Sequence, residues 1–313
     1  MKKLLKLLIL PLALLMGSWT INHSASYNST NEFSIHTPSD LPKMATPGEK
    51  DTILLRVAFL GDAEPKPLAE FPGMSAAVDQ INTLGQTQHI DFVIGVGDIA
   101  HKGTEIQYQA ATPVLQKLAH PFYPIMGNEE HGSTVDRFLY YAKQWNKKVD
   151  STKYVLEFDQ LAFVFASPDF SRDFDNKGAG WILEQIQRLA PKPIILIVHG
   201  AQKGVYPENR KKGIGNRMFR KKVIAQPNLA VVVSGDLHMD MDRTGHSKKI
   251  KNVQYLHIPA LERTKIPDET RHTPMFRVMT IYQDGKVTVD TYAVGDTNPK
   301  KEHAYSFSIT LVK

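Results

Sequence analysis

Four short apolar runs constrain the fold of this chain more than any other feature of its sequence. Each run has the length of a strand, and together they cover residues 52–60, 91–96, 193–198 and 229–234. Strands that are apolar on both faces belong in a buried sheet that helices cover. Helical patterns lie between the runs, at residues 74–85, 105–119 and 178–190. This alternation predicts a layered α/β domain.

Two further segments have the pattern of β-hairpins. They cover residues 154–167 and 275–294, and the second contains a turn signal at Gln283-Asp284-Gly285. Residues 305–312 alternate apolar and polar side chains and predict another strand. Hairpins beside buried runs favour a mixed sheet, or two sheets packed face to face with helices outside. A chain of 313 residues with 42% hydrophobic residues can bury a core of this size.

The amino terminus has the pattern of a signal peptide. Three lysines in the first six residues precede an apolar stretch at 7–16, so we expect residues 1–26 to be removed and the protein to be exported, to the periplasm or outside the cell. The stretch is shorter than the roughly 20 residues of a spanning helix, so no membrane span is expected after cleavage. Residues 27–50 are rich in Asn, Ser, Thr and Pro and predict a flexible leader before a domain at 51–313. The chain has no cysteine, which excludes disulfides and thiolate metal ligands.

The charge of the chain is mildly basic, at a net +6 that includes the three amino-terminal lysines. This value fits an anionic substrate and is too low for a dedicated nucleic-acid-binding protein. The densest basic stretch, residues 203–222, holds eight Lys and Arg side chains against the single acid Glu208. It could capture a phosphate-rich substrate, or it could be a solvated helix face, which is the favoured interpretation. If the chain were an anion-binding surface protein, its binding of anions would depend on salt concentration and would survive removal of metal.

Acidic, amide and imidazole side chains follow five successive predicted strands. They are Asp62 and Glu64, then Asp98, then Asn128, Glu129, Glu130 and His131, then His199, and finally Asp236 and His238. The carboxyl ends of strands in an α/β sheet form the usual crevice for ligands. One acid at one strand end would mean little, because Asp is common in turns. Five such ends predict a functional site.

The order of these motifs resembles the calcineurin-like metallophosphoesterases, whose five blocks run DxH, GDxx, GNHD/E, a lone His and GHxH. Here the blocks stand at residues 62–64, 97–98, 127–130, 199 and 235–238. The resemblance covers about residues 53–293 and implies a four-layer αββα sandwich, with two mixed sheets flanked by helices.

The resemblance also implies two metal ions. One would be held by Asp62, Glu64, Asp98 and His238, and the other by Asp98, Asn128, His199 and Asp236, with Asp98 shared between them. Such a pair turns a water into a hydroxide nucleophile that attacks a phosphate mono- or diester, from a small molecule or a macromolecule. The sequence gives no expectation for the oligomeric state.

Three residues depart from the family pattern, since Glu64, Glu129 and Asp236 stand where the family has histidine. A ligand set rich in carboxylates favours manganese or iron over zinc and predicts reduced activity. Asn128 and Glu129 are the catalytic candidates, and Glu129 would donate a proton if it is protonated at working pH. The alternative for Glu129 and Glu130 is a solvated turn without a role, and a structural role is favoured for His131.

A second function remains open beside the hydrolase. The chain could be a catalytically degenerate member that uses the same pocket as a binding module for metal or a phosphate ligand. In that case the wild type would show no turnover, so replacement of Asp98 would have no activity to abolish.

Overall fold

The computed structural model describes residues 34–36, 52–66, 68–238, 241, 245–262 and 272–312, all of which belong to the unit formed by residues 32–313. The predicted signal peptide, residues 1–26, lies outside the described residues. The leader expected over residues 27–50 does so too, except for strand β1 (Ser34–His36), which pairs in parallel with β5. At these three residues the segment expected to be flexible joins a sheet.

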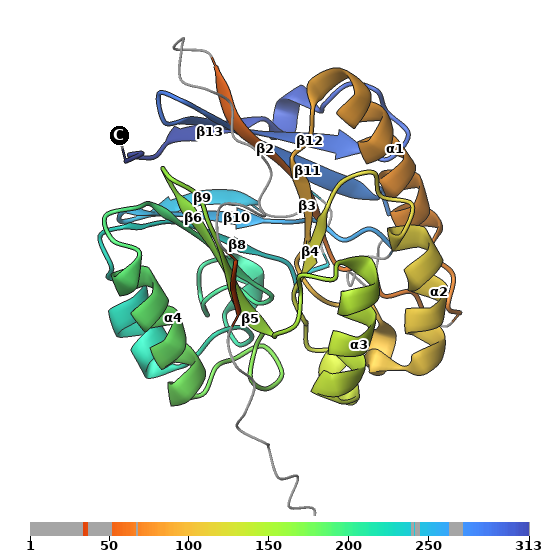
Figure 1. Ribbon diagram of the computed structural model, residues 1–313, viewed down its shortest axis with the longest axis horizontal. Coiled ribbons are helices and arrows are strands. Elements are labelled where there is room, and N and C mark those ends of the chain that lie inside the picture. Colours follow the sequence, from red (N-terminus) through yellow and green to blue (C-terminus); the bar gives the residue numbers. More distant parts are fainter. Residues whose placement is uncertain are drawn as a thin grey trace, which may run out of the picture. The chain divides into compact units, whose positions relative to one another are not determined.

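Two mixed sheets form the centre of the fold (Figure 1). The seven-stranded sheet has, in order, β1, β5 (Lys153–Glu157), β6 (Ala162–Ala166), β7 (Ile194–Val198), β8 (Leu229–Ser234), β10 (Val253–His257) and β9 (Ser247–Ile250). The six-stranded sheet has, in order, β13 (Tyr305–Ser308), β12 (Lys286–Ala293), β11 (Met275–Tyr282), β2 (Ile53–Leu60), β3 (Phe92–Gly95) and β4 (Phe122–Pro124). The four apolar runs of the sequence are β2, β3, β7 and β8.

Helices flank the two sheets. They are α1 (Pro72–Gln88), α2 (Glu105–Leu115), α3 (Val135–Trp145) and α4 (Asn176–Arg188), with shorter helical segments η2 (His101–Gly103), η3 (Glu130–Gly132), η4 (Pro207–Asn209), η5 (Phe219–Val223) and η6 (Lys301–His303). The apolar face of α3 joins the core between the sheets. Helices α1 and α2 pack on the six-stranded sheet, and α4 and η5 pack on the seven-stranded sheet. The predicted four-layer αββα sandwich is confirmed.

The apolar runs are continuous because each strand has two buried faces. In β7, Ile195 and Ile197 lie in the core between the two sheets, whereas Ile194, Leu196 and Val198 pack in the core beneath α4. All five side chains are buried. Successive side chains of a strand point to opposite faces, so a strand in the middle of this sandwich must be apolar at every position.

Helix α3 was not predicted, although its signal is present in the sequence. The Thr134 hydroxyl caps the helix by accepting the backbone N–H of Arg137 at 3.2 Å. Its buried side chains, Phe138, Leu139, Tyr141 and Ala142, recur at the spacing of one helical face. Tyr141 stacks on Tyr108 of α2 with ring centroids 4.7 Å apart, which fixes the two helices against each other.

The predicted hairpins are confirmed as β5–β6 and β11–β12, both antiparallel. Gly285 in the second turn has φ +84°, a conformation that favours glycine. In the described part of the chain, no helix has both the length and the apolar character that crossing a membrane requires.

The carboxyl ends of strands from both sheets meet at one end of the sandwich. The Val96 N–H after β3 donates to the Leu60 carbonyl at the end of β2, and the Gly235 N–H after β8 donates to the His199 carbonyl after β7. The Ile125 N–H after β4 donates to the Gly95 carbonyl of β3, and the Asp236 N–H after β8 donates to the Asp62 carboxylate after β2, which joins the ends of the two sheets. The predicted site residues all lie on the segments that follow β2, β3, β4, β7 and β8.

Candidate metal centre

Backbone hydrogen bonds hold the site loops against one another. The N–H groups of Ala63 and Glu64 donate to the Asp98 carbonyl at 3.0 and 2.8 Å. The Asp236 N–H donates to the Asp62 carboxylate, with its two oxygens at 2.9 and 3.0 Å. These bonds connect the first, second and fifth sequence blocks directly, so contacts within the protein place the side chains that these blocks carry.

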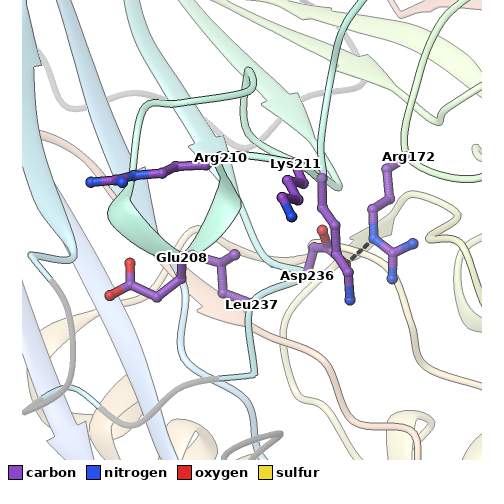
Figure 2. Close-up of a pocket in the computed structure, with 7 residues that line it drawn as sticks. Arg172, Glu208, Arg210, Lys211, Asp236 and Leu237 are labelled. Carbon is purple, nitrogen blue, oxygen red and sulfur yellow. Dashed lines mark hydrogen bonds and ion pairs between the residues drawn. The ribbon is translucent and has the colours of Figure 1, made fainter.

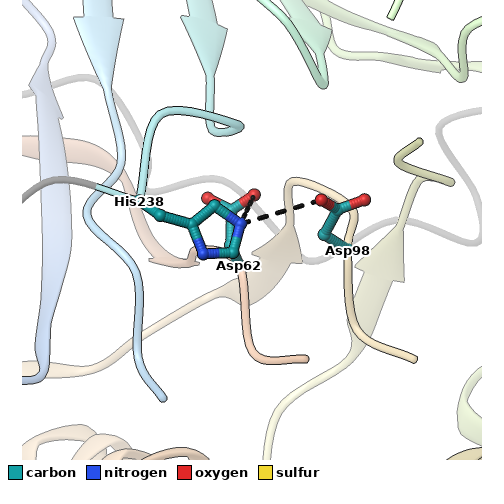
Figure 3. A group of neighbouring side chains, drawn as sticks. All are labelled: Asp62, Asp98 and His238. Atoms are coloured by element: carbon teal, nitrogen blue, oxygen red, sulfur yellow. Dashed lines mark ion pairs between the residues drawn. The ribbon is translucent and has the colours of Figure 1, made fainter. Parts of the chain in front are cut away.

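His238 is the centre of the first group of side chains (Figure 3). Its Nε2 lies 3.3 Å from Asp62 Oδ1, 3.2 Å from Glu64 Oε2 and 3.7 Å from Asp98 Oδ2. All four side chains are buried. This is the set that the sequence predicts for the first metal ion.

His199 is the centre of the second group. Its Nε2 lies 3.2 Å from Asn128 Oδ1, 3.4 Å from Asp98 Oδ1 and 3.8 Å from Asp236 Oδ1. The opposite ring nitrogen, Nδ1, lies 2.9 Å from the Val96 carbonyl oxygen and donates its hydrogen there. A histidine whose Nδ1 donates to a backbone carbonyl presents the Nε2 lone pair to a metal ion. The predicted second ligand set is thus also brought together.

The residues present fit a pair of divalent ions. Two donors that bind one ion at about 2.1 Å lie roughly 3.0–3.4 Å apart, and most of the distances in both groups are in this range. Asp98 Oδ2 and His238 Nε2 are buried and have no hydrogen-bond partner among the residues that the structure describes. Buried polar atoms are normally satisfied, and a bound cation would satisfy the carboxylate oxygen and the imidazole lone pair together.

Protons balance the buried charge when no cation is bound. Burial lowers the pKa of His199, but the carboxylates of Asp98, Asp236 and Asp62 raise it by more, and the net pKa is about 10. The pKa of His238 is raised to about 9 in the same way, mainly by Asp62 and Asp98 against the effect of burial. Both rings must release a proton before they can bind a cation, so metal binding is linked to proton release.

Three of the candidate metal ligands have left-handed backbone conformations. The φ angles are +53° at Asp98, +71° at Asp236 and +50° at His238. Gly97 precedes the first of them with φ +94°, and a Cβ there would lie 2.7 Å from Gly127 Cα and 2.8 Å from His199 Nδ1. Only glycine permits this close approach, which brings the second and third sequence blocks against His199.

Glu130 is not a solvated turn residue, because its side chain is completely buried. Its two carboxylate oxygens accept four backbone N–H groups, from Asp98, Ile99, Ala100 and Gly127, at 2.7–3.1 Å. Burial, and then the charge of Asp98, raise the pKa of Glu130 to about 8, against the opposing effect of the N–H donors of Ala100 and Gly127. Glu130 shapes the loop that carries Asp98, a role that sequence reasoning missed.

Glu129 lies beside the centre and is held by neighbouring donors. Its Oε2 lies 2.6 Å from His101 Nδ1 and accepts the Lys102 N–H at 3.1 Å, while Lys66 Nζ is 3.7 Å from its Oε1. Burial raises the pKa of Glu129, but the Lys102 N–H, the Lys66 charge and His101 outweigh it, and the net shift is downward. The proton-donor role of Glu129 stays a prediction, and the lowered pKa counts against it.

Glu129 is also close enough to the first group to contribute a ligand atom. One of its carboxylate oxygens lies within 4.8 Å of carboxylate oxygens of Glu64 and Asp98, which lie within the same distance of each other. The structure therefore adds Glu129 to the residues that could bind a cation, a role that the sequence did not suggest.

Each of the three acids that replace a family histidine has a cation beside it. Lys66 Nζ lies 3.9 Å from Glu64 Oε1 as well as near Glu129, and Arg172 Nε lies 2.5 Å from Asp236 Oδ1. Neither cation is among the site residues predicted from the sequence. Lys66 could have been found, since it is two residues from Glu64, but Arg172 is 64 positions from Asp236 and has no sequence signal.

His131 does not take part in the site. Its Nε2 lies 3.0 Å from the Pro168 carbonyl oxygen, and burial lowers its pKa. The structural role favoured for His131 is consistent with this contact.

Comparisons with known proteins agree with this geometry. The model of the calcineurin-like phosphoesterase family matches residues 55–240. A purple acid phosphatase from yellow lupin (Lupinus luteus) seeds superposes with a TM-score of 0.60 at 14% identity, over 84% of this chain and 55% of the lupin chain. A dimetal phosphatase from Danio rerio gives a TM-score of 0.62 at 10% identity, over 82% of this chain and 99% of the other.

A third solved structure, GAP50, the anchor in the inner membrane complex of Plasmodium, gives a TM-score of 0.55 at 12% identity, over 83% of this chain and 89% of that chain. This chain spans little more than half of the lupin phosphatase. No curated protein sequence matches the chain. At these identities the solved structures establish the fold, and the family model includes all five sequence blocks.

Proposed function

Because the chain belongs to the calcineurin-like phosphoesterase family, we propose that it is a metal-dependent hydrolase of phosphate mono- or diesters. One observation carries the proposal: two buried histidines each face a set of carboxylate or amide oxygens, and Asp98 contributes to both sets. A site that only stabilised the fold would have no need of two adjacent cation-binding groups that share one carboxylate.

The ligand assignment follows the two groups. Asp62, Glu64, Asp98 and His238 would hold one ion, and Asp98, Asn128, His199 and Asp236 would hold the other. When bound, two such ions polarise a phosphoryl group and activate water for in-line attack. The high share of carboxylate ligands supports manganese or iron rather than zinc.

The chain's own cations would orient the substrate. Lys66 and the Nη groups of Arg172 can attract an anionic phosphoryl group to the centre, and they offset the carboxylates at positions 64, 129 and 236. Four carboxylates among the ligands would otherwise repel an anionic ester. Compensation by neighbouring cations supports an active centre in spite of the missing histidines.

Metal stoichiometry is the measurement that tests the proposal. The protein, purified without chelator, is incubated with manganese, iron or zinc salts and analysed for bound metal, together with Asp98→Asn and the exposed control Asp159→Asn. We expect about two ions per chain in the wild type and the control, and at most one in Asp98→Asn. Hydrolysis of aryl phosphate mono- and diesters is then measured with the preferred ion, and we expect it to be lost in Asp98→Asn.

The same experiment distinguishes the hydrolase from the binding module. Bound metal without hydrolysis of any ester would favour the binding module over the hydrolase. The absence of bound metal under every condition would overturn the dimetal centre itself.

Export is also part of the proposal, on the evidence of the amino-terminal sequence alone. We expect the mature protein to begin near residue 27 and to be recovered from the periplasm or the medium. Amino-terminal sequencing of the fractionated protein tests this, and a full-length product in the cytoplasm would contradict it.

A further inference from the structure

We propose that a cationic pocket beside the metal centre binds a second phosphate group of the substrate, so that the preferred substrate carries two phosphates. This inference rests on the proposed hydrolase function and adds the substrate class. The pocket has a volume of about 390 Å³, and its cations are Arg172, Arg210, Lys211 and Lys212 (Figure 2). Asp236, a proposed metal ligand, also lines it.

The shared residue makes the pocket and the centre adjacent. Asp236 Oδ1 lies 3.8 Å from His199 Nε2 on the side of the centre and 2.5 Å from Arg172 Nε on the side of the pocket. A molecule with one phosphoryl group at the centre can therefore extend past Asp236 into the pocket. The small volume suits a second phosphate on a short linker better than a long polymer.

The basic side chains at residues 210–212 are exposed at the mouth of the pocket. Within the part of the chain that the structure describes, the side chains of Arg210, Lys211 and Lys212 form no hydrogen bond or ion pair. Arg172 uses Nε for Asp236, and its two Nη groups have no described partner. Four cations gathered around two carboxylates, Glu208 and Asp236, leave an excess of positive charge that a dianionic group would neutralise.

The cations differ in their orientation. Figure 2 shows Lys211 between Arg210 and Arg172, with the Arg210 guanidinium directed away from the other cations. We therefore expect Lys211 to contact the second phosphate and Arg210 to contribute less. Lys212 also lines the pocket, and Arg172 lies between the second phosphate and the phosphoryl group at the centre.

The backbone around the pocket is organised before any ligand binds. The buried Asn209 side chain accepts the N–H groups of Gly204 and Tyr206 and donates to the Gln202 carbonyl, which fixes the turn before Arg210. The Asp173 carboxylate accepts the N–H groups of Gly215 and Asn216 at 2.9 and 3.1 Å. This contact joins the basic segment to the loop that carries Arg172, so little ordering is needed on binding.

The rest of the basic stretch provides a matched control. Arg220, Lys221 and Lys222 lie on η5, are exposed to solvent and do not line the pocket. The sequence interpretation of a solvated face fits this half of residues 203–222, whereas the half around Lys211 lines a pocket next to the proposed centre.

Binding of two phosphonates by calorimetry tests the inference without turnover. The probes are propylphosphonate, with one anionic head, and 1,3-propanediphosphonate, with two. They are titrated into manganese-loaded wild type, Lys211→Gln/Lys212→Gln and the control Lys221→Gln/Lys222→Gln, after the metal content of each has been measured. We expect the diphosphonate to bind the wild type and the control about tenfold more tightly than the monophosphonate. The preference should disappear in Lys211→Gln/Lys212→Gln, with its affinity for propylphosphonate changed by less than about threefold.

The outcomes separate the two proposals. Equal binding of both probes by a metal-loaded wild type would overturn the second phosphate site and leave the hydrolase proposal intact. An equal loss of preference in both double variants would also overturn it, because the effect would then reflect net charge. A wild type that binds no metal would overturn the proposed function, and with it the second phosphate site, regardless of how the phosphonates bind.

Discussion

The carboxylate of Glu130 accepts the backbone N–H of Asp98 at 3.1 Å. It therefore holds in place the backbone of the residue that both proposed metal sites share. Each Glu130 oxygen accepts two N–H groups, and no other side chain in the described part of the chain reaches the same donors. Substitution by glutamine would therefore place an amide NH₂ against two N–H donors.

At pH 9, where Glu130 is ionised in spite of its raised pKa of about 8, Glu130→Gln should lower the free energy of unfolding by about 2–3 kcal/mol, because two buried donors lose their acceptor. It should also reduce bound metal, since the Asp98 loop loses its support. Urea denaturation and elemental analysis measure the two effects, with the exposed Glu184→Gln as the control. A variant as stable as the control would show that Glu130 is not a structural acceptor.

Lys66→Gln should weaken inhibition by inorganic phosphate about three- to fivefold at low salt, because Glu64 and Glu129 lose their nearest cation. Salt screens a partly exposed charge, so the difference should shrink as ionic strength rises. Phosphate inhibition constants at two salt concentrations measure this. The exposed Lys177→Gln should behave as wild type, and an equal effect of both substitutions would refute a local role for Lys66.

Arg172→Gln should raise the KM for phosphate esters about tenfold and leave metal occupancy unchanged or higher. The guanidinium both attracts the ester and competes with cations for Asp236, so its loss affects the two ligands in opposite directions. Steady-state kinetics and metal titration test the pair of effects, with Arg217→Gln as the control. Loss of metal in Arg172→Gln would show instead that Arg172 is required to hold Asp236 in place.

His257 should make the fold sensitive to acid. Burial lowers its pKa well below 6.5, and the neighbouring charges of His246 and Arg277 lower it further, against the opposite effect of Asp62. A base with a depressed pKa in the folded state stabilises the fold fully above the unfolded pKa of 6.5, and that stability is lost as the pH falls below it.

The free energy of unfolding of His257→Leu, relative to that of the wild type, should consequently rise by up to about 2 kcal/mol as the pH is lowered from 8 to 5. In the described part of the chain neither ring nitrogen of His257 has a hydrogen-bond partner, so leucine removes the titrating group without breaking any hydrogen bond described there. Urea denaturation with chelator present gives the comparison, and His303→Leu provides a partly exposed control. Parallel pH profiles for His257→Leu and wild type would contradict the assignment.

The sequence predicted the parts of the fold that depend on local pattern. Apolar runs such as residues 193–198 predicted buried strands, and their order along the chain predicted which polar residues would meet. The supporting contacts were not predictable in this way. Arg172 reaches Asp236, and Glu130 reaches Ala100, only because separate strands bring their loops together, and no periodicity encodes that proximity. Helix α3 is a different case, because its cap at Thr134 and its apolar face can both be recognised in the sequence.

The left-handed backbone at Asp98, Asp236 and His238 bears on how such a protein can evolve. Each side chain in this conformation costs the fold about 1 kcal/mol relative to glycine, so the residues that would bind metal are also positions where the chain is locally strained. A lineage released from selection for hydrolysis could gain stability by replacing them, whereas the reverse path would lose it. Descent from an enzyme to an inert scaffold would thus be thermodynamically downhill in this architecture, so the strained side chains are stable against replacement only while selection acts on what they do.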